Sequence, residues 1–379
     1  MMLERTARRA TAARVRGLRS ARAGAAAALL GILLCGVAQA EPYLAVANGL
    51  KCSQCHVNPT GGGERTVFGE AFAQGVLPAN HLDTGGDTWT GQLNRYVAIG
   101  GDLRYDATVT QVSGQPSTSD LELQRSRVYL SVSPIPDRLL LYVDEQVAPD
   151  GAVNREAWGM FWSANHSWYV KAGQMYLPFG LRLQDQTAFV LRATGIDMTT
   201  SDAAVEFGWL KGHWDAQLSL SNGTADGPAT GNGKQGGLQL AYVETSWRLG
   251  VAANVNDSSS TGSRTAYAVF GGLKTGPIAW LAQAEVTDDR SLAIPQKQLA
   301  GLLEANYSPA RGHNIKVTGE YLNENRDVGD DRLKRLSLVY EYSPIQFLQL
   351  RGGFRYNDGI LDHPELHQNQ YFFELHGFF

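Results

Sequence analysis

The chain predicts an all-β fold, a 16-stranded antiparallel outer-membrane β-barrel with a small segment in front of it. Three observations lead to this prediction. From about residue 92 onward, apolar and polar residues alternate in segments of about ten, as in strands that face lipid on one side and a polar lumen on the other. The connections between the segments are alternately short and long. The number of segments is even, as in bacterial outer-membrane barrels.

The strands alternate visibly along single segments. Leu336 and Leu338 fall on one face, whereas Arg335, Ser337 and Glu341 fall on the other. A soluble sandwich also alternates, but the regular change between short turns and long loops favours the barrel. The strands are expected, to within a few residues, near 92–111, 119–133, 138–147, 154–164, 167–176, 203–211, 213–222, 236–245, 248–256, 264–274, 277–287, 297–308, 312–324, 332–343, 345–357 and 367–379.

Aromatic residues near the strand ends suit the interfacial girdles of such a barrel, with ordinary packing as the alternative. These residues are Trp158, Trp162, Trp168, Tyr169, Trp209, Trp214, Trp247, Trp280 and Tyr307. The C-terminal residues Tyr371, Phe373, Leu375 and Phe379 share one face and end on an aromatic ring. This ending resembles the signal that outer-membrane barrels present to the barrel assembly machinery.

The first 40 residues read as a secretory signal peptide. They combine an arginine-rich start, an apolar block at 25–34 and the small-residue end Ala38-Gln39-Ala40. The block is shorter than the roughly 20 residues that span a bilayer, so cleavage after Ala40 is expected. Because residues 1–40 hold seven Arg and one Glu, the remainder has 26 basic and 36 acidic residues, a formal net charge of −10. Such a balance argues against nucleic acid as a partner.

The chemistry of the predicted mature chain centres on Cys52-Ser-Gln-Cys55-His56. Two cysteines two residues apart, followed at once by histidine, form the attachment signature of c-type haem. Each thiol would bond one vinyl group of the porphyrin, and His56 would bind the iron on the proximal side. The alternatives are a short disulfide between the two cysteines or part of a zinc site. The zinc reading lacks ligands, because only His81 lies nearby.

Residues 41–90 are predicted to form a monohaem cytochrome c-like plug segment ahead of the porin-like barrel at 91–379. The segment, with a short helix expected at 65–73, is too small to bury a core of its own. It is therefore expected at or inside the periplasmic mouth of the barrel. Leu50, Phe68 and Phe72 are candidates for contact with the porphyrin, and packing without haem contact is the alternative.

The second axial ligand of the haem iron is not set by spacing. His81 is the candidate that we favour, because it is the only other histidine between the motif and the first strand. Met175 is the alternative, since it shares a strand face with Lys171 and is expected to point into the lumen. A third possibility is that the second axial position is open or occupied by water. A methionine ligand would raise the reduction potential of the haem.

A signal peptide, one CxxCH segment and a sixteen-strand barrel in one chain resemble the outer-membrane monohaem cytochrome–porin fusions, whose best-known members oxidise extracellular Fe(II). The barrel part, with Arg125-Ser-Arg127-Val-Tyr129 and Gly173-Gln-Met-Tyr-Leu-Pro178-Phe-Gly180, is similar to phosphate-selective porins. The resemblance implies one covalent haem c and a location in the bilayer of the outer membrane. It also implies an Fe(II)-oxidase type of electron transfer with a soluble periplasmic cytochrome as acceptor.

The expected function is therefore electron transfer between an extracellular donor such as Fe(II) and a periplasmic acceptor. Acidic loop residues are either Fe(II)-attracting groups or a solvated rim: Asp288, Asp289, Asp327, Asp330, Asp331, Asp358 and Asp362. One alternative is outward electron transfer to extracellular acceptors. The other is a diffusion porin for small anions whose lumen is lined by Arg125, Arg127, Arg335, Arg351 and Arg355. The inward phase also holds Glu285, Glu304, Glu320, Glu341 and Glu374, which predicts a lumen of mixed charge.

Overall fold

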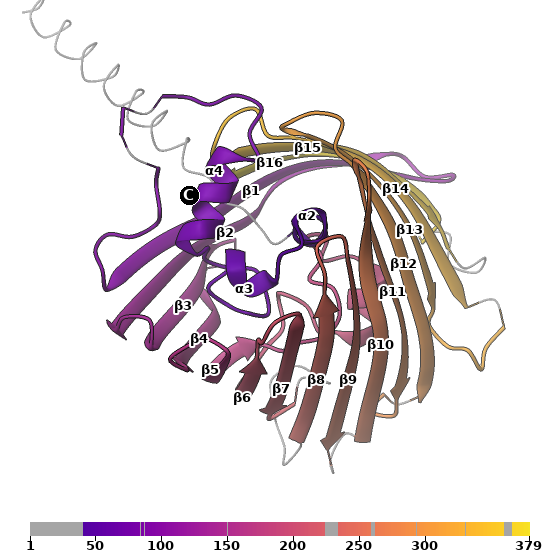
Figure 1. Ribbon diagram of the computed structural model, residues 1–379. Coiled ribbons are helices and arrows are strands. Elements are labelled where there is room, and N and C mark those ends of the chain that lie inside the picture. Colours follow the sequence, from indigo (N-terminus) through magenta and orange to yellow (C-terminus); the bar gives the residue numbers. More distant parts are fainter. Residues whose placement is uncertain are drawn as a thin grey trace, which may run out of the picture.

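The computed structural model describes residues 41–83, 85–86, 88–149, 151–223, 234–258, 262–292, 294–329, 331–359 and 366–379. The signal peptide predicted at 1–40 lies outside the described residues, as do Asp330 and Asp362 of the acidic loops. Sixteen strands form one closed antiparallel barrel in sequence order, with β1 pairing β16 to close the wall (Figure 1). The predicted fold class is confirmed.

All sixteen predicted strands are present within a few residues of the expected bounds. They are β1 Val97–Val112, β2 Thr118–Ile135, β3 Leu139–Ala148, β4 Val153–Trp162, β5 Trp168–Tyr176, β6 Ser201–Trp209, β7 Trp214–Ser221, β8 Lys234–Val243, β9 Trp247–Ser258, β10 Gly262–Thr275, β11 Ile278–Asp289, β12 Gln296–Tyr307, β13 His313–Asn323, β14 Arg332–Tyr342, β15 Leu348–Asp358 and β16 Gln368–Phe378. The largest difference is at β1, which starts five residues later than predicted. There, the Asn94 side chain accepts hydrogen bonds from Tyr96 N and Val97 N, which forms a turn.

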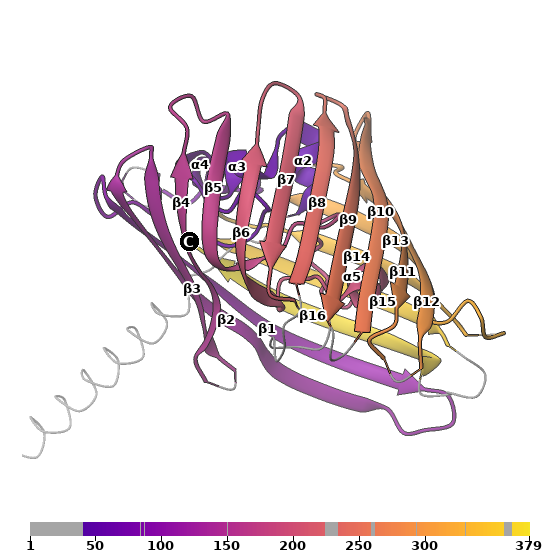
Figure 2. The same cartoon turned by 90° about the horizontal axis from the view of Figure 1, so that it is seen from below.

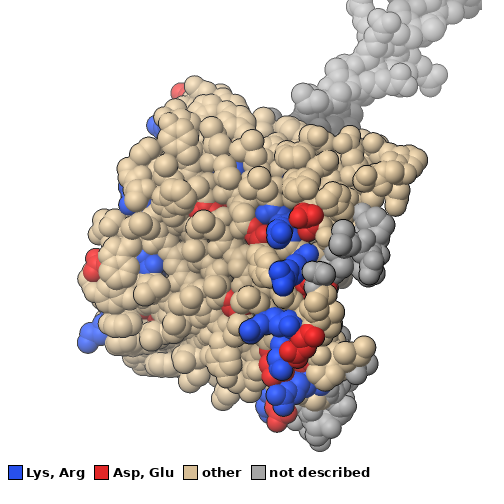
Figure 3. Space-filling view, turned by 90° about the vertical axis from the view of Figure 1, so that its right-hand side faces the viewer, with Lys and Arg blue, Asp and Glu red and all other residues tan. Residues whose placement is uncertain are grey.

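The wall has the predicted alternation of an apolar outer face and a polar inner face. On β14, Leu336 is 56% exposed and Leu338 is 52% exposed, whereas Arg335, Ser337 and Glu341 are buried. Figure 3 shows one flank of the barrel, on which broad areas carry no charge and the charged side chains gather in one part. Apolar groups turned outward and charged groups buried inward suit a bilayer as the surrounding solvent. Among the described residues, no helix has the length and apolar content needed to cross a membrane.

The aromatic girdle is confirmed in part. Trp168, Trp209, Trp214, Trp247 and Tyr307 are exposed on the outer face near the short turns. Trp158 and Tyr169 are buried inside instead, and their assignment to the girdle was wrong. The ring of Trp158 stacks on Tyr142 with centroids 4.6 Å apart, and Tyr169 donates its hydroxyl to Glu206 at 2.6 Å. Both residues fall on the inward phase of their strands, which determines their direction despite the aromatic character.

The N-terminal segment lies inside the barrel at the end where the short turns gather (Figures 1 and 2). It contains α2 Pro42–Asn48, α3 Cys52–Cys55 and α4 Val67–Gly75. Contacts with four short turns hold it at this mouth. Lys51 Nζ donates to Gly212 O at 2.8 Å, Lys274 Nζ donates to Ala47 O at 2.7 Å, and Ala79 N donates to Ser343 O at 2.8 Å. The fourth contact joins Arg311 to Gly75 O.

A second segment, the connection between β5 and β6, also enters the lumen. Residues 177–200, with α5 Phe189–Thr194, cross to the opposite wall. Leu181 N donates to Gln283 Oε1 at 2.7 Å, and Phe189 N donates to Glu320 Oε1 at 2.8 Å. The sequence predicted only a long loop here. The inward course of this segment could have been recognised from its apolar content, which is unusual for a loop turned toward water.

One buried side chain links the N-terminal segment to two strands of the wall. Asn58 donates through Nδ2 to Glu156 at 2.8 and 3.1 Å and accepts from Lys171 Nζ at 3.0 Å. Lys171 also pairs with Glu206 at 3.1 Å. These four side chains are at most 1% exposed. A buried amide that satisfies a charge on each side is costly to remove, because those charges lose their partner.

Replacing Asn58 with Ala should loosen the N-terminal segment. Leaving Glu156 and Lys171 without this partner costs about 1–3 kcal/mol, so the undocked fraction should rise roughly tenfold. Limited proteolysis in detergent micelles measures this as faster cleavage within residues 41–90. Asn48→Ala is the matched control, because Asn48 is exposed and bonds only Leu44 O of its own helix. Equal cleavage rates in both variants would contradict the docking role of Asn58.

Candidate haem-binding site

The cysteine motif forms a single helical turn. Gln54 N donates to Lys51 O at 3.1 Å, and His56 N donates to Cys52 O at 2.9 Å. The Gln54 side chain accepts from Lys51 N at 2.8 Å. Because residues three apart are neighbours on a helix surface, this turn brings Cys52 and Cys55 to one face. The local fold thus presents both thiols in one direction, as attachment to a single cofactor requires.

The motif is held from one side by α4. A Cβ on Gly69 would lie 2.1 Å from Cys55 O, so only glycine permits this close approach. Thr66 N donates to Cys55 O at 3.1 Å, and the Thr66 hydroxyl donates to Gln54 O at 2.6 Å. The same hydroxyl accepts from Gly69 N and caps α4. Motif and helix therefore form one unit, and the helix predicted at 65–73 is present, displaced by two residues.

The glycine run after the motif forms a constrained turn. Gly61, Gly62 and Gly63 have φ of 95°, 83° and 67°, conformations that L side chains rarely adopt. A Cβ on Gly63 would lie 2.4 Å from the Tyr142 hydroxyl, and one on Gly61 would lie 3.6 Å from Cys52 Sγ. The turn thereby returns the chain past the first cysteine and sets its backbone against the barrel wall.

His56 is buried and has an unsatisfied ring nitrogen. Its Nδ1 atom lacks a hydrogen-bond partner among the described residues. Burial, together with the nearby Arg65 charge, lowers the pKa of His56 to about 3. The imidazole is therefore neutral at ordinary pH, which is the form that binds a metal. A buried, neutral imidazole with an unpaired ring nitrogen suits the role of an axial iron ligand.

The two cysteines are free thiols in the structure. Burial raises the pKa of Cys55 to about 11 and also raises that of Cys52. Both are thus protonated and unreactive as simple nucleophiles. Among the described residues, no group of three or more His, Cys, Asp or Glu could hold a metal ion, so the zinc alternative gains no support.

Cys52, Cys55 and His56 line one cavity of about 100 Å³. Leu50 and Phe72, two of the predicted porphyrin contacts, line it as well, together with Leu44, Ala73 and Leu77. Ligand pockets are usually apolar with a few polar groups. The apolar lining, the paired thiols and the unsatisfied His56 nitrogen together suit the chemistry of a covalently attached haem.

The other predicted site residues lie elsewhere. His81 is exposed, with its Nε2 atom 3.5 Å from Gln346 Nε2, and it is not part of the cavity lining. Met175 is fully buried but does not line the cavity either. Phe68 is 49% exposed on the outer side of α4. The structure therefore brings His56 to the cavity but neither of the two candidates for the second axial position.

The barrel contributes residues that sequence reasoning missed. Arg182 from the β5–β6 connection, Asp215 from β7 and Arg248 from β9 line the same cavity. Arg248 donates to Leu50 O, which ties the wall to a residue two positions before the motif. These residues are separated from the motif by more than a hundred positions. No local spacing in the chain could have indicated them.

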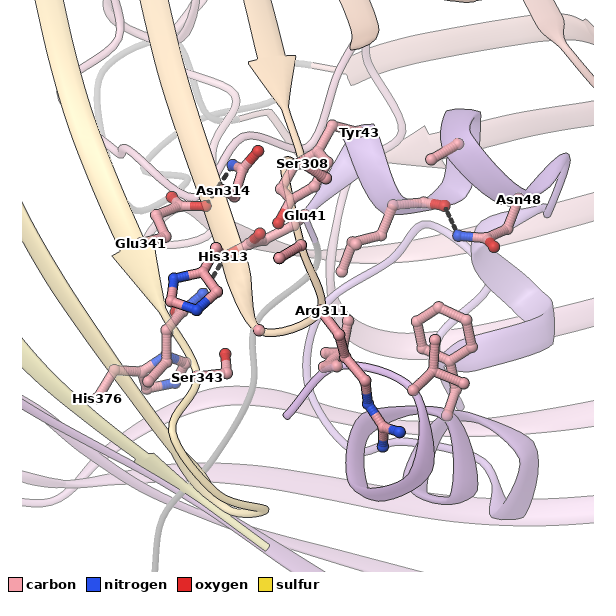
Figure 4. A pocket seen from close by; sticks show the side chains of 18 of the residues that line it. Glu41, Tyr43, Asn48, Ser308, Arg311, His313, Asn314, Glu341, Ser343 and His376 are labelled. Carbon is pink, nitrogen blue, oxygen red and sulfur yellow. Dashed lines mark hydrogen bonds between the residues drawn. The ribbon is translucent and has the colours of Figure 1, made fainter. Parts of the chain in front are cut away.

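A second pocket of about 200 Å³ adjoins this cavity at the short-turn mouth. It lies between α2, α4 and the β12–β13 and β14–β15 turns, and it shares Glu41, Leu44, Phe72 and Leu77 with the first cavity. Figure 4 shows Arg311 extending toward α4, and Asn314 donating to Glu341 at 2.7 Å on the wall side. The cavity that contains the motif is thus separated from the mouth by a thin layer.

The charged residues predicted inside the lumen are there, and most of them are paired. Arg335 contacts Glu320 and also pairs with Asp185 at 3.4 Å. Arg351 pairs with Glu341 at 3.3 Å and with Glu374 at 2.9 Å. The predicted mixture of signs is therefore organised as ion pairs. Arginines neutralised by carboxylates offer little attraction to a passing anion.

No protein-family model matches the chain, and no curated protein sequence matches it. Solved structures do. An anion-selective porin from Comamonas acidovorans is similar with a TM-score of 0.60 at 12% identity, covering 75% of this chain and 99% of that one. OprB of Pseudomonas putida gives 0.59 at 10%, covering 76% and 95%. The outer membrane channel DcaP of Acinetobacter baumannii gives 0.56 at 13%, covering 75% and 97%.

At such low identity, these likenesses establish the fold alone. The chain has the sixteen-strand barrel of outer-membrane porins. The three porins carry no argument about the cysteine motif, which is a property of this chain's own N-terminal segment.

Proposed function

We propose that the protein is an outer-membrane electron conduit in which one c-type haem, attached to Cys52 and Cys55, exchanges electrons between an extracellular donor and a periplasmic acceptor. The observation that carries the proposal is the meeting of both thiols and the buried His56 at one cavity inside the barrel. His56 would hold the iron, and the thiols would anchor the porphyrin. When bound, the haem supplies one-electron chemistry between Fe(III) and Fe(II).

The chain's own residues prepare this site in three ways. The α3 turn orients the thiols, and the packing of α4 through Gly69 fixes that turn. The neutral imidazole of His56 is ready to ligate without first losing a proton. Leu50, Phe72 and Leu77 give the cavity an apolar side. The polarity of the surroundings is one of the factors that set a haem reduction potential.

The filled lumen favours electron transfer over passage of solutes. The N-terminal segment and residues 177–200 are far apart in the sequence, but both enter the lumen. They meet there, since Gly62 lies against the sulfur of Met198. Lumen-facing Asp144, Lys171 and Glu206 are 0% exposed. Electrons need closely packed matter between donor and acceptor, whereas solutes need an open path.

The extracellular donor follows from the resemblance and not from the geometry. Fe(II) is the donor that we favour, and the exposed acidic loops are its candidate contacts. The acceptor would be a soluble periplasmic cytochrome. The predicted export signal, the apolar outer wall and the porin fold support a place in the outer membrane. Outward electron transfer, from the periplasm to extracellular acceptors, would use the same haem and the same two surfaces in the opposite direction.

The second candidate function is a diffusion porin with an accessory haem segment. The likeness to an anion-selective porin and to an outer membrane channel favours it. Paired lumen arginines and the two inserted segments oppose it. The two functions differ in whether the native barrel conducts ions.

The protein purified from outer membranes should carry one covalent haem. The expected results are an alkaline pyridine haemochrome spectrum of the thioether type and a chain mass increased by one haem. The double variant Cys52→Ser/Cys55→Ser should lose both signals, because no thiol remains to bond the vinyl groups. Ser53→Ala, between the two cysteines, is the control and should retain them. A colourless native protein at the unmodified mass would refute the proposal.

Planar-bilayer recording separates the conduit from the diffusion porin. The native protein should insert with little ion conductance, because both lumen segments are packed against the wall. Asn58→Ala, which releases the N-terminal segment, should show intermittent openings, and Asn48→Ala should behave like the native chain. A large, steady conductance from native protein at full haem occupancy would favour the diffusion porin instead.

A further inference from the structure

The short-turn mouth carries a surface that the electron-transfer function alone does not explain. We propose that this surface docks a soluble electron-carrier protein whose own surface is acidic around its redox centre. The inference rests on the proposed function in one respect, which is that the docked partner exchanges electrons with the haem. Its location and the charge of the partner come from the exposed residues of the mouth.

The centre of the surface is the outer face of α4. Val67, Phe68 and Val76 are 44%, 49% and 51% exposed. The acidic residue of the helix, Glu70, turns inward and pairs with Arg65 at 3.1 Å, which leaves the outer face without charge. In Figures 1 and 2, α4 lies at the mouth, inside the ring of strands, so the bilayer does not cover it. An uncovered apolar patch on a water-facing surface marks an interaction site.

Basic residues are spread over the same mouth of the barrel. Lys51, Arg95, Arg138, Lys211, Lys274 and Arg311 lie on the plug and the short turns, and none of these described residues takes part in an ion pair. Lys51, Lys274 and Arg311 donate to backbone carbonyls, which leaves their charges in place. The described acidic residues of the same rim are Asp83, Asp137 and Glu244.

Among the described residues, the rim is therefore positive on a chain whose formal net charge is −4. Six bases against three acids give the described rim a charge of +3. A local charge opposite to that of the whole chain is a specific feature of this surface. Complementary charge steers diffusing partners and raises association rates by roughly 10- to 1000-fold at low salt. The occupant that fits is an acidic protein.

The position of α4 explains why this partner would be an electron carrier. The inner face of the helix, through Phe72, Ala73 and Leu77, lines the cavity that holds the cysteine motif. One helix, about 10 Å across, therefore separates a protein docked on Phe68 from that cavity. An apolar centre with a charged rim also suits a short-lived complex, because rim charges act mainly on the association rate.

The test measures electron exchange between the haem-loaded protein in detergent and two soluble c-type cytochromes, one acidic and one basic, by stopped-flow absorbance. The acidic cytochrome should react faster, and its rate should fall as salt rises, because salt screens the attraction. Arg95→Glu/Lys211→Glu should slow it at least tenfold at low salt and little at high salt. Phe68→Ser should slow it at every salt concentration.

The control variant carries the same charge reversals at the other end of the barrel. Lys297→Glu/Lys334→Glu changes two exposed bases near the long loops and should leave the rate unchanged. The haem content and visible spectrum of every variant should match the native protein. Equal rates for the two cytochromes, or equal effects at both barrel ends, would overturn the docking surface while leaving the conduit intact. A protein without haem would instead refute the proposed function. Calorimetric titration with the acidic cytochrome would then test the docking surface independently, because binding would support it and no binding would overturn it.

Discussion

The structure depends on one constraint, which is that a closed barrel of sixteen strands has an interior that must be filled or remain wet. Here two segments of the chain occupy part of it. Asn58 connects the N-terminal segment to Glu156 and Lys171, and residues 177–200 reach Gln283 and Glu320 on the far wall. Because these contacts pair buried charges and amides, they hold the segments in single positions.

The fold is shared with porins, but here two segments of the same chain enter the lumen. In an open porin, lumen arginines attract solutes, but here Arg351 and Arg335 are paired with carboxylates. The cavity inside is small, mostly apolar and bordered by two thiols and a neutral imidazole. Its chemistry suits a fixed cofactor. The fold is the part shared with porins, and the site is the part that belongs to this chain.

The sequence predicts the wall well because the residues of each strand alternate between an apolar outer face and a polar inner face. Alternation located all sixteen strands, and only local effects, such as the Asn94 turn before β1, moved a boundary. The inward course of residues 177–200 was missed, because loop length says nothing about direction. The motif was found from its spacing, whereas Arg182, Asp215 and Arg248 reach the cavity only through barrel closure. The second axial ligand stays a prediction, since His81 and Met175 lie outside the cavity lining.

Electron flow across a sealed membrane tests the central claim most directly. Vesicles containing the haem-loaded protein would enclose ferricyanide and receive Fe(II) outside, with an ionophore to balance charge. The account predicts reduction of the enclosed ferricyanide while an enclosed small dye stays inside, and no reduction with Cys52→Ser/Cys55→Ser protein. Equal reduction by both proteins, or reduction that occurs only as the dye escapes, would contradict the account. Either result would show that Fe(II) or ferricyanide crosses through an open pore and that the haem does not transfer the electrons.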